Sequence, residues 1–213
     1  MFYLAFIFSL SLINAKLPND VRWVVSSDEY KYNCIQTFQM AYHAILEECN
    51  NIKQPVIIMD LDETVLDNSN YQIGLFEKGE KYNPDSWSDW VNKKEAKLVP
   101  GAKEFILNYK KIDEAIIIYI SNRMNKNLSS TKDNMKNLGI LFEDDIFLLR
   151  LDKADTKVVR RDEVFNGIGR MQEHGMKNVI AYFGDAMGDF PNDPKYKWTQ
   201  NKFIFPNPMY GKW

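Results

Sequence analysis

Three stretches of the chain place polar side chains capable of chemistry directly after a run of aliphatic residues. They are "VIIMDLD" with Asp60 and Asp62, "IIIYISN" with Ser121 and Asn122, and "IAYFGDAMGD" with Asp185 and Asp189. Two carboxylates about 4 Å apart repel each other by roughly 4 kcal/mol at an effective dielectric of 20. If these stretches meet in the fold, the cluster of acids needs a bound cation, a protonated member, or both.

The candidate ligand atoms in these stretches are all oxygens, with no histidine or cysteine beside them. Oxygen-only sites select hard cations, so we expect one Mg²⁺ per site. An ionised carboxylate beside a protonated one supplies a nucleophile and an acid, which is a working pair for phosphoryl transfer. Each residue alone has an ordinary alternative, such as a helix cap for Asp60 or a turn for Ser121-Asn122. Their coincidence at three strand ends favours a site.

These stretches meet only if the aliphatic runs form neighbouring parallel strands. Strands are predicted at Val56–Met59, Ala115–Ile120, Ile146–Leu149, Val179–Phe183 and Phe203–Phe205. The alternation of strands and helices favours an α/β fold, a three-layer Rossmann-like open parallel sheet. In such a sheet the carboxyl ends of the strands share one edge, where ligands bind.

Helices are expected between most of the strands. One is predicted from Pro100 through Tyr109, and a second from Asn127 to Gly139. A third is predicted over about 155–174, with Val164, Ile168 and Met171 on one face and Gly175 as its end.

Two segments lie outside this alternation. An N-terminal helix is predicted over about residues 27–50, because apolar residues recur there every three or four positions. Residues 71–98 follow the first strand and far exceed the usual connection of ~2–6 residues, so we expect a small helical cap. Its aromatic residues Tyr82, Trp87 and Trp90 could form the core of the cap. The core is favoured for Trp90, whereas Trp87 could equally contact a substrate.

The first segment is apolar from Phe2 to Ile13 and ends in Ile13-Asn14-Ala15, an acceptable small-residue cleavage site. It predicts a secretory signal peptide over residues 1–15 and a mature domain over residues 16–213. A buried N-terminal helix stays open as an alternative, because the basic n-region is missing. The run is shorter than the ~20 apolar residues of a spanning helix. We therefore expect an exported protein, periplasmic or extracellular, without a stable membrane anchor.

Composition limits the remaining possibilities. A length of 213 residues, of which 45% are hydrophobic, suits one sizeable globular domain. The net charge of −2 gives no basis for binding nucleic acid or anionic membranes. Cys34 and Cys49 lie 15 residues apart on one predicted helix, a rise of about 22 Å, whereas disulfide-bonded Cα atoms lie about 5.5 Å apart. We therefore expect two buried thiols.

The polar stretches resemble the four motifs of the haloacid dehalogenase superfamily of phosphohydrolases. In order, these are Asp60-Leu61-Asp62-Glu63-Thr64 for its DxDxT signature, Ser121, Lys157 in "DTKVVRR", and Gly184-Asp185 with Asp189. A closer resemblance, to the bacterial class C acid phosphatases of subfamily IIIB with their lipoprotein 5'-nucleotidases, covers almost the whole mature chain. It runs from "SSDEYKYN" through "SNR" to "FPNPMYGKW".

This resemblance implies the role of each site residue. Asp60 would attack phosphorus to form an aspartyl-phosphate, while protonated Asp62 would serve as the acid and then as the base. Mg²⁺ would be held by the Asp60 carboxylate, the Asp62 backbone carbonyl, Asp185, and Asp189 through water. Ser121 and Lys157 would bind phosphoryl oxygens, with Lys153, Arg160 and Arg161 as alternatives to Lys157. The residues expected to contact the substrate are Thr64, Asn122, Trp87 and Tyr210.

The implied activity is hydrolysis of a small-molecule phosphomonoester, a nucleoside monophosphate or another aromatic one. One departure from the family is Ala186, which stands where its fourth motif usually has asparagine. Two alternatives stay open: a phosphotransferase or mutase with an acceptor other than water, and a weakened relative that serves as a surface or ligand-binding protein. The oligomeric state, a homodimer included, is also open.

Overall fold

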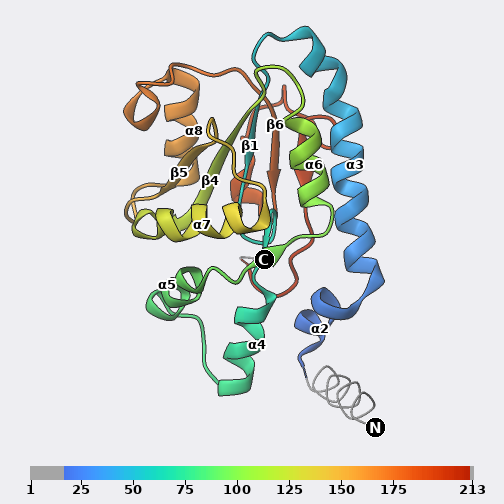
Figure 1. Cartoon of the computed structure of the whole chain (residues 1–213), viewed down its shortest axis with the longest axis vertical. Coiled ribbons are helices and arrows are strands. Elements are labelled where there is room, and N and C mark those ends of the chain that lie inside the picture. Colours follow the sequence, from blue (N-terminus) through green and yellow to red (C-terminus); the bar gives the residue numbers. More distant parts are fainter. Residues whose placement is uncertain (1–16, 212–213) are drawn as a thin grey trace.

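The computed structural model describes residues 17–211, whose core is an open five-stranded sheet between layers of helices (Figure 1). The strands are β1 (Val56–Met59), β4 (Ile116–Met124), β5 (Ile146–Arg150), β6 (Val179–Gly184) and β7 (Lys202–Ile204). All neighbours are parallel, in the order β5-β4-β1-β6-β7. The predicted α/β open parallel sheet is confirmed. The signal peptide predicted over residues 1–15 lies outside the described residues.

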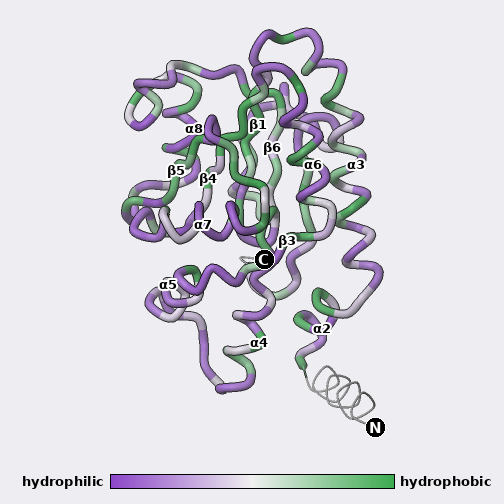
Figure 2. The backbone as a smooth tube through the Cα atoms, in the orientation of Figure 1, coloured by the Kyte–Doolittle hydropathy of each residue, from purple (hydrophilic) through white to green (hydrophobic). Residues whose placement is uncertain are grey.

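Both faces of the sheet are buried, which explains the unbroken apolar sequence of its central strands. Because successive side chains of a strand point to opposite faces, Val56 and Ile58 of β1 join one core while Ile57 and Met59 join the other. Helices α3 (Asp28–Asn51), α6 (Ala102–Tyr109) and α7 (Leu128–Leu138) contribute to the core that contains Met59. Helix α8 (Lys157–Asn166) covers the opposite face. Figure 2 shows hydrophobic residues concentrated along β1 and its neighbours.

The predicted N-terminal helix is confirmed as α3. Its first turn is capped by Ser27, whose hydroxyl accepts a hydrogen bond from the Tyr30 N–H at 3.1 Å. Cys34 and Cys49 both lie on α3 as free, buried thiols, as expected. A short helix that the sequence pattern did not predict, α2 (Asn19–Ser26), precedes it. None of the helices over residues 17–211 has the length and apolarity that crossing a bilayer requires.

The insertion after β1 forms a cap of two helices, α4 (Ser69–Lys78) and α5 (Pro84–Lys93). A small antiparallel sheet of β2 (Leu66–Asp67) and β3 (Lys97–Leu98) closes its base. The cap lies beyond the carboxyl ends of the strands, beside α7 (Figure 1). A buried hydrogen bond of 2.9 Å from the Ser88 hydroxyl to the Asn127 side chain joins α5 to the turn before α7. The cap is therefore anchored to the core domain by polar contacts.

The aromatic residues of the cap divide between core and surface. Trp90 is buried, as predicted. Tyr82 is 61% exposed in the link between α4 and α5, so its assignment to the cap core is wrong. Its ring lies 6.4 Å from the ring of Trp87, and most of its surface faces solvent. Trp87 is half-buried, with its ring edge-on to Tyr71 at 5.1 Å.

Two helix boundaries differ from the prediction. Helix α6 begins at Ala102, two residues after Pro100, because Gly101 with φ 87° occupies the N-cap. The helix predicted over 155–174 ends at Asn166, where Gly167 turns the backbone at φ 62°. A 3₁₀ turn, η2 (Gly169–Met171), follows, and Ile168 is 54% exposed rather than on the buried face. A Cβ at position 167 would lie 2.4 Å from the Met176 backbone nitrogen, so the chain there is packed around a glycine.

We predict that Gly167→Ala lowers the free energy of unfolding by about 2–5 kcal/mol, as the sum of left-handed strain and a steric overlap. Gly175→Ala is the matched control: its φ is 69°, and a Cβ there meets nothing within 4 Å. The free energy of unfolding of that variant is expected to fall only by the left-handed backbone strain, about 1–2 kcal/mol. Urea denaturation of both variants measures the difference, and equal losses would contradict the packing argument.

Candidate active site

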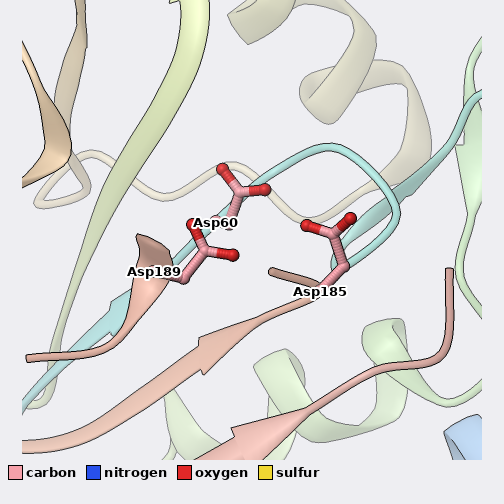
Figure 3. A group of neighbouring side chains, drawn as sticks. All are labelled: Asp60, Asp185 and Asp189. Carbon is pink, nitrogen blue, oxygen red and sulfur yellow. The ribbon is translucent and has the colours of Figure 1, made fainter. Parts of the chain in front are cut away.

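Three aspartates from two loops lie together at the carboxyl edge of the sheet. Asp60 follows β1 directly, Asp185 follows β6, and Asp189 ends a 3₁₀ turn, η3 (Met187–Asp189). Since β1 and β6 are paired parallel neighbours, their ends are adjacent, and the Asp60 N–H donates to the Phe183 carbonyl at 2.9 Å. One carboxylate oxygen of each aspartate lies within 4.8 Å of the others (Figure 3). The three side chains form a unit, called the aspartate triad below.

The aspartate triad fits a divalent cation. All its donors are carboxylate oxygens, which suit a hard ion. Burial raises the pKa of the Asp60 carboxyl, and Asp189 and Asp185 add to this effect. Burial and the neighbouring Asp189 likewise raise the pKa of Asp185 to about 6. These acids therefore resist ionising together unless positive charge is brought among them.

Lys157 supplies one such charge, from the first residue of α8. Its Nζ donates to Asp60 Oδ1 at 2.5 Å and also to Asp189. Although burial lowers the pKa of Lys157, the two carboxylates outweigh burial and raise it, which keeps the ammonium charged. The alternatives to Lys157 lie elsewhere: Lys153 is exposed, and buried Arg160 donates to the main-chain carbonyls of Ser121 and Leu148.

Backbone geometry brings the fourth-motif aspartates together. A Cβ on Gly184 would lie 2.3 Å from the Asp189 side chain, so only glycine allows the loop to fold back this closely. The Ala186 N–H donates to Asp189 Oδ2 at 2.9 Å, a backbone contact that any residue except proline can make at that position. The Asp185 carboxylate accepts a hydrogen bond of 2.7 Å from the Asn207 amide, near the C-terminus. The sequence reasoning did not identify Asn207, although it lies in the quoted "FPNPMYGKW".

The side chain of Asp62 does not join the triad, which corrects the expectation of four acids crowded in one pocket. Its Oδ1 accepts from Arg123 Nε at 2.9 Å, and Arg123 Nη2 lies 2.8 Å away. The same oxygen accepts from Asn68 Nδ2 at 3.0 Å. The physical reason is that a buried guanidinium draws this carboxylate away from the other three.

Arg123 and Asn68 are the functional candidates that sequence reasoning missed. Both are essentially buried, with 1% and 0% of their surface exposed. The available signal was the arginine in "ISNR", since a charged residue at the end of an apolar strand needs a buried partner. Its partner, Asp62, comes from a different strand end, so the pairing appears only in three dimensions.

The remaining predicted site residues differ in how exposed they are to solvent. Thr64 is fully buried, and its contact with substrate stays a prediction. Ser121 is also fully buried, and its hydroxyl donates to Asp62 Oδ2 at 3.3 Å. Asn122 is exposed, with its side-chain carbonyl bound by Arg160 at 2.8 Å. Trp87 lies over the Arg123 guanidinium at 5.8 Å, and Tyr210 is half-buried in the C-terminal segment.

Solved structures share the fold of this chain. The class C acid phosphatase from Bacillus anthracis superposes with a TM-score of 0.76 at 29% identity, over 94% of this chain and 86% of that one. The same enzyme with tungstate bound gives a TM-score of 0.75 at 29% identity, with the same coverage.

Two plant proteins are similar in sequence. Vegetative storage protein 1 of Arabidopsis thaliana is 26% identical over 191 residues, which are 88% of this chain and 67% of that protein. The stem 31 kDa glycoprotein of Glycine max is 26% identical over 162 residues, covering 73% of this chain and 59% of its own length. The family model described as HAD superfamily, subfamily IIIB (acid phosphatase) matches residues 5–213. The chain therefore belongs to subfamily IIIB of the haloacid dehalogenase superfamily, the acid phosphatases, and is a phosphoric monoester hydrolase.

Proposed function

We propose that this chain is an exported, Mg²⁺-dependent acid phosphatase that acts through an aspartyl-phosphate on Asp60. The observation that carries the proposal is the convergence of Asp60, Asp185, Asp189 and Lys157 at one edge of the sheet. Two buried acids and a half-buried one, with a single lysine, retain unbalanced negative charge, which a divalent cation would offset. The apolar segment over residues 1–15 supports export.

In the first half of the reaction, the Asp60 carboxylate attacks phosphorus and the bond to the leaving oxygen breaks. Asp62 gives its proton to that oxygen, so that an alcohol departs. Lys157 stabilises the charge on the transferring group from its position against Asp60. In the second half, Asp62 takes a proton from water, which attacks phosphorus and releases Asp60 and phosphate. A divalent cation held by the triad and the Asp62 carbonyl would supply electrostatic stabilisation of the phosphoryl oxygens.

The substrate class we propose is an aromatic phosphomonoester, with nucleoside monophosphates as the leading examples. Trp87 supports this, because its half-buried ring lies over Arg123, which in turn binds Asp62. A ring stacked there would gain about 0.5–1.5 kcal/mol beyond its burial. Tyr210, on the C-terminal segment that also carries Asn207, is the second candidate contact.

We predict that Asp60→Asn abolishes hydrolysis of p-nitrophenyl phosphate, because an amide cannot form the acyl phosphate. Asp162→Asn is the control, since Asp162 is an exposed residue of α8. It is expected to retain wild-type kcat and KM. Steady-state assays at mildly acidic pH with Mg²⁺ measure both variants. Undiminished turnover by Asp60→Asn would refute the covalent mechanism.

We predict that a chelator abolishes activity and that Mg²⁺ restores it.

The stabilisation of the fold by Mg²⁺ should increase from pH 5 to pH 7. In the metal-free protein, burial raises the pKa of Asp185 from its ordinary 3.8 to about 6. This protonated acid contributes stability that is present below about pH 4 and is lost as the pH rises through about 6. Protons thus compete with the cation at low pH, by about tenfold in affinity per pH unit.

The measurement is the free energy of unfolding in urea, with Mg²⁺ and with chelator, at pH 5, 6 and 7. Asp185→Asn should bind the cation more weakly and should flatten the pH dependence of the difference. A stabilisation by Mg²⁺ that is independent of pH in the wild-type protein would contradict the assignment of Asp185 as a ligand.

A further inference from the structure

The two oxygens of the Asp62 carboxylate have different surroundings. Oδ1 accepts hydrogen bonds from Arg123 Nε at 2.9 Å and Asn68 Nδ2 at 3.0 Å, with Arg123 Nη2 at 2.8 Å. Oδ2 accepts only a long contact of 3.3 Å from the Ser121 hydroxyl among the described residues. The side chain keeps 15% of its surface exposed. One oxygen is therefore clamped while the other is left available.

Arg123 is itself held rigidly. Its side chain has no exposed surface, and Nη1 donates to the Thr131 hydroxyl of α7 at 3.2 Å. Nη2 also donates to the Asn68 side-chain carbonyl at 3.3 Å. A guanidinium fixed at several donors loses little further freedom when it holds a carboxylate, so it defines that carboxylate's orientation.

Asn68 connects the Arg123–Asp62 pair to the cap. Its amide donates to Asp62 Oδ1 and to the Leu66 carbonyl at 3.2 Å. Its carbonyl oxygen accepts from Arg123 and, at 2.9 Å, from the indole N–H of Trp90 in α5. The hydrogen-bonding capacity of the Asn68 side chain is thus fully used. The cap, through Trp90, supports the group that orients Asp62.

We propose that Arg123 and Asn68 are positioning residues that fix Asp62 by Oδ1 and leave Oδ2 as the atom that exchanges the proton with the leaving group. This inference rests on the proposed function, in which Asp62 is the general acid. When the acid gives up its proton, negative charge develops on Asp62, and the fixed guanidinium is already in place to stabilise it. The same contact holds the carboxylate oriented for its later role as base.

The distinguishing consequence concerns the leaving group. An ester with a good leaving group, p-nitrophenyl phosphate, needs little proton donation, whereas an alkyl ester, β-glycerol phosphate, depends on it. Arg123→Met should therefore lower kcat/KM for the alkyl ester by about 10²–10⁴-fold, the usual range of general acid catalysis. The loss for p-nitrophenyl phosphate should be at least tenfold smaller. Arg123→Lys, which keeps the charge but not the fork, should recover part of the alkyl activity.

Two further variants test whether a general loss of folding could explain the result. Arg170→Met removes a different arginine, which is partly buried and binds Asp155 and Glu163, and should leave the ratio of the two kcat/KM values unchanged. Trp90→Phe removes the indole donor to Asn68 together with part of a buried ring, and should shift the ratio in the same direction by a smaller factor. It provides the test if Arg123→Met does not fold.

Equal losses on both esters in Arg123→Met, or in Trp90→Phe in its place, would overturn the inference alone. A wild-type protein that hydrolyses neither ester in the presence of Mg²⁺ would overturn the proposed function, and the inference with it.

Discussion

Carboxylates that are held close together with little access to water repel each other, and three of them meet at the carboxyl edge of the sheet in this protein. Asp60, Asp185 and Asp189 each place an oxygen within 4.8 Å of the others, and burial raises the pKa of Asp60 and of Asp185. Lys157, the first residue of α8, offsets part of the negative charge of these carboxylates. The negative charge that remains makes the aspartate triad suitable for binding a divalent cation. Because the parallel strands end side by side, the fold brings the repelling carboxylates and the lysine that stabilises them to the same edge of the sheet.

The scaffold beneath this edge is arranged to tolerate the crowding. Strand β1 is buried on both faces, so its end cannot move to relax the acids. Gly184 allows the β6 loop to return over Asp189, and the hydrogen bond from Asn207 fixes Asp185 from the C-terminal segment. The position of Ala186 supports Asp189 through its backbone N–H, so the loss of a polar side chain there leaves this support intact.

The side chain of Asp62 lies apart from the aspartate triad. Asp62 is two residues from Asp60, yet its side chain pairs with Arg123 instead of the triad. The cap contributes to this separation, since Trp90 and Arg123 share Asn68. The cap therefore takes part in the internal organisation of the site.

The sequence by itself determined the parallel α/β sheet, the N-terminal helix, the cap and the aspartates and lysine of the site. The sheet, the helix and the cap follow from local periodicity, and the aspartates from motifs that end strands, all of which are written in consecutive residues. Lys157 was indicated by the resemblance to the third motif of the family. The sequence could not determine the early end of α8, because the obstacle at Gly167 is the backbone of Met176, nine residues further on. Nor could it pair Asp62 with Arg123 or Asp185 with Asn207, since each pair joins segments that meet only after the strands have aligned. Tertiary structure decided which charges became neighbours, because electrostatic and steric contacts depend on distance in space rather than along the chain.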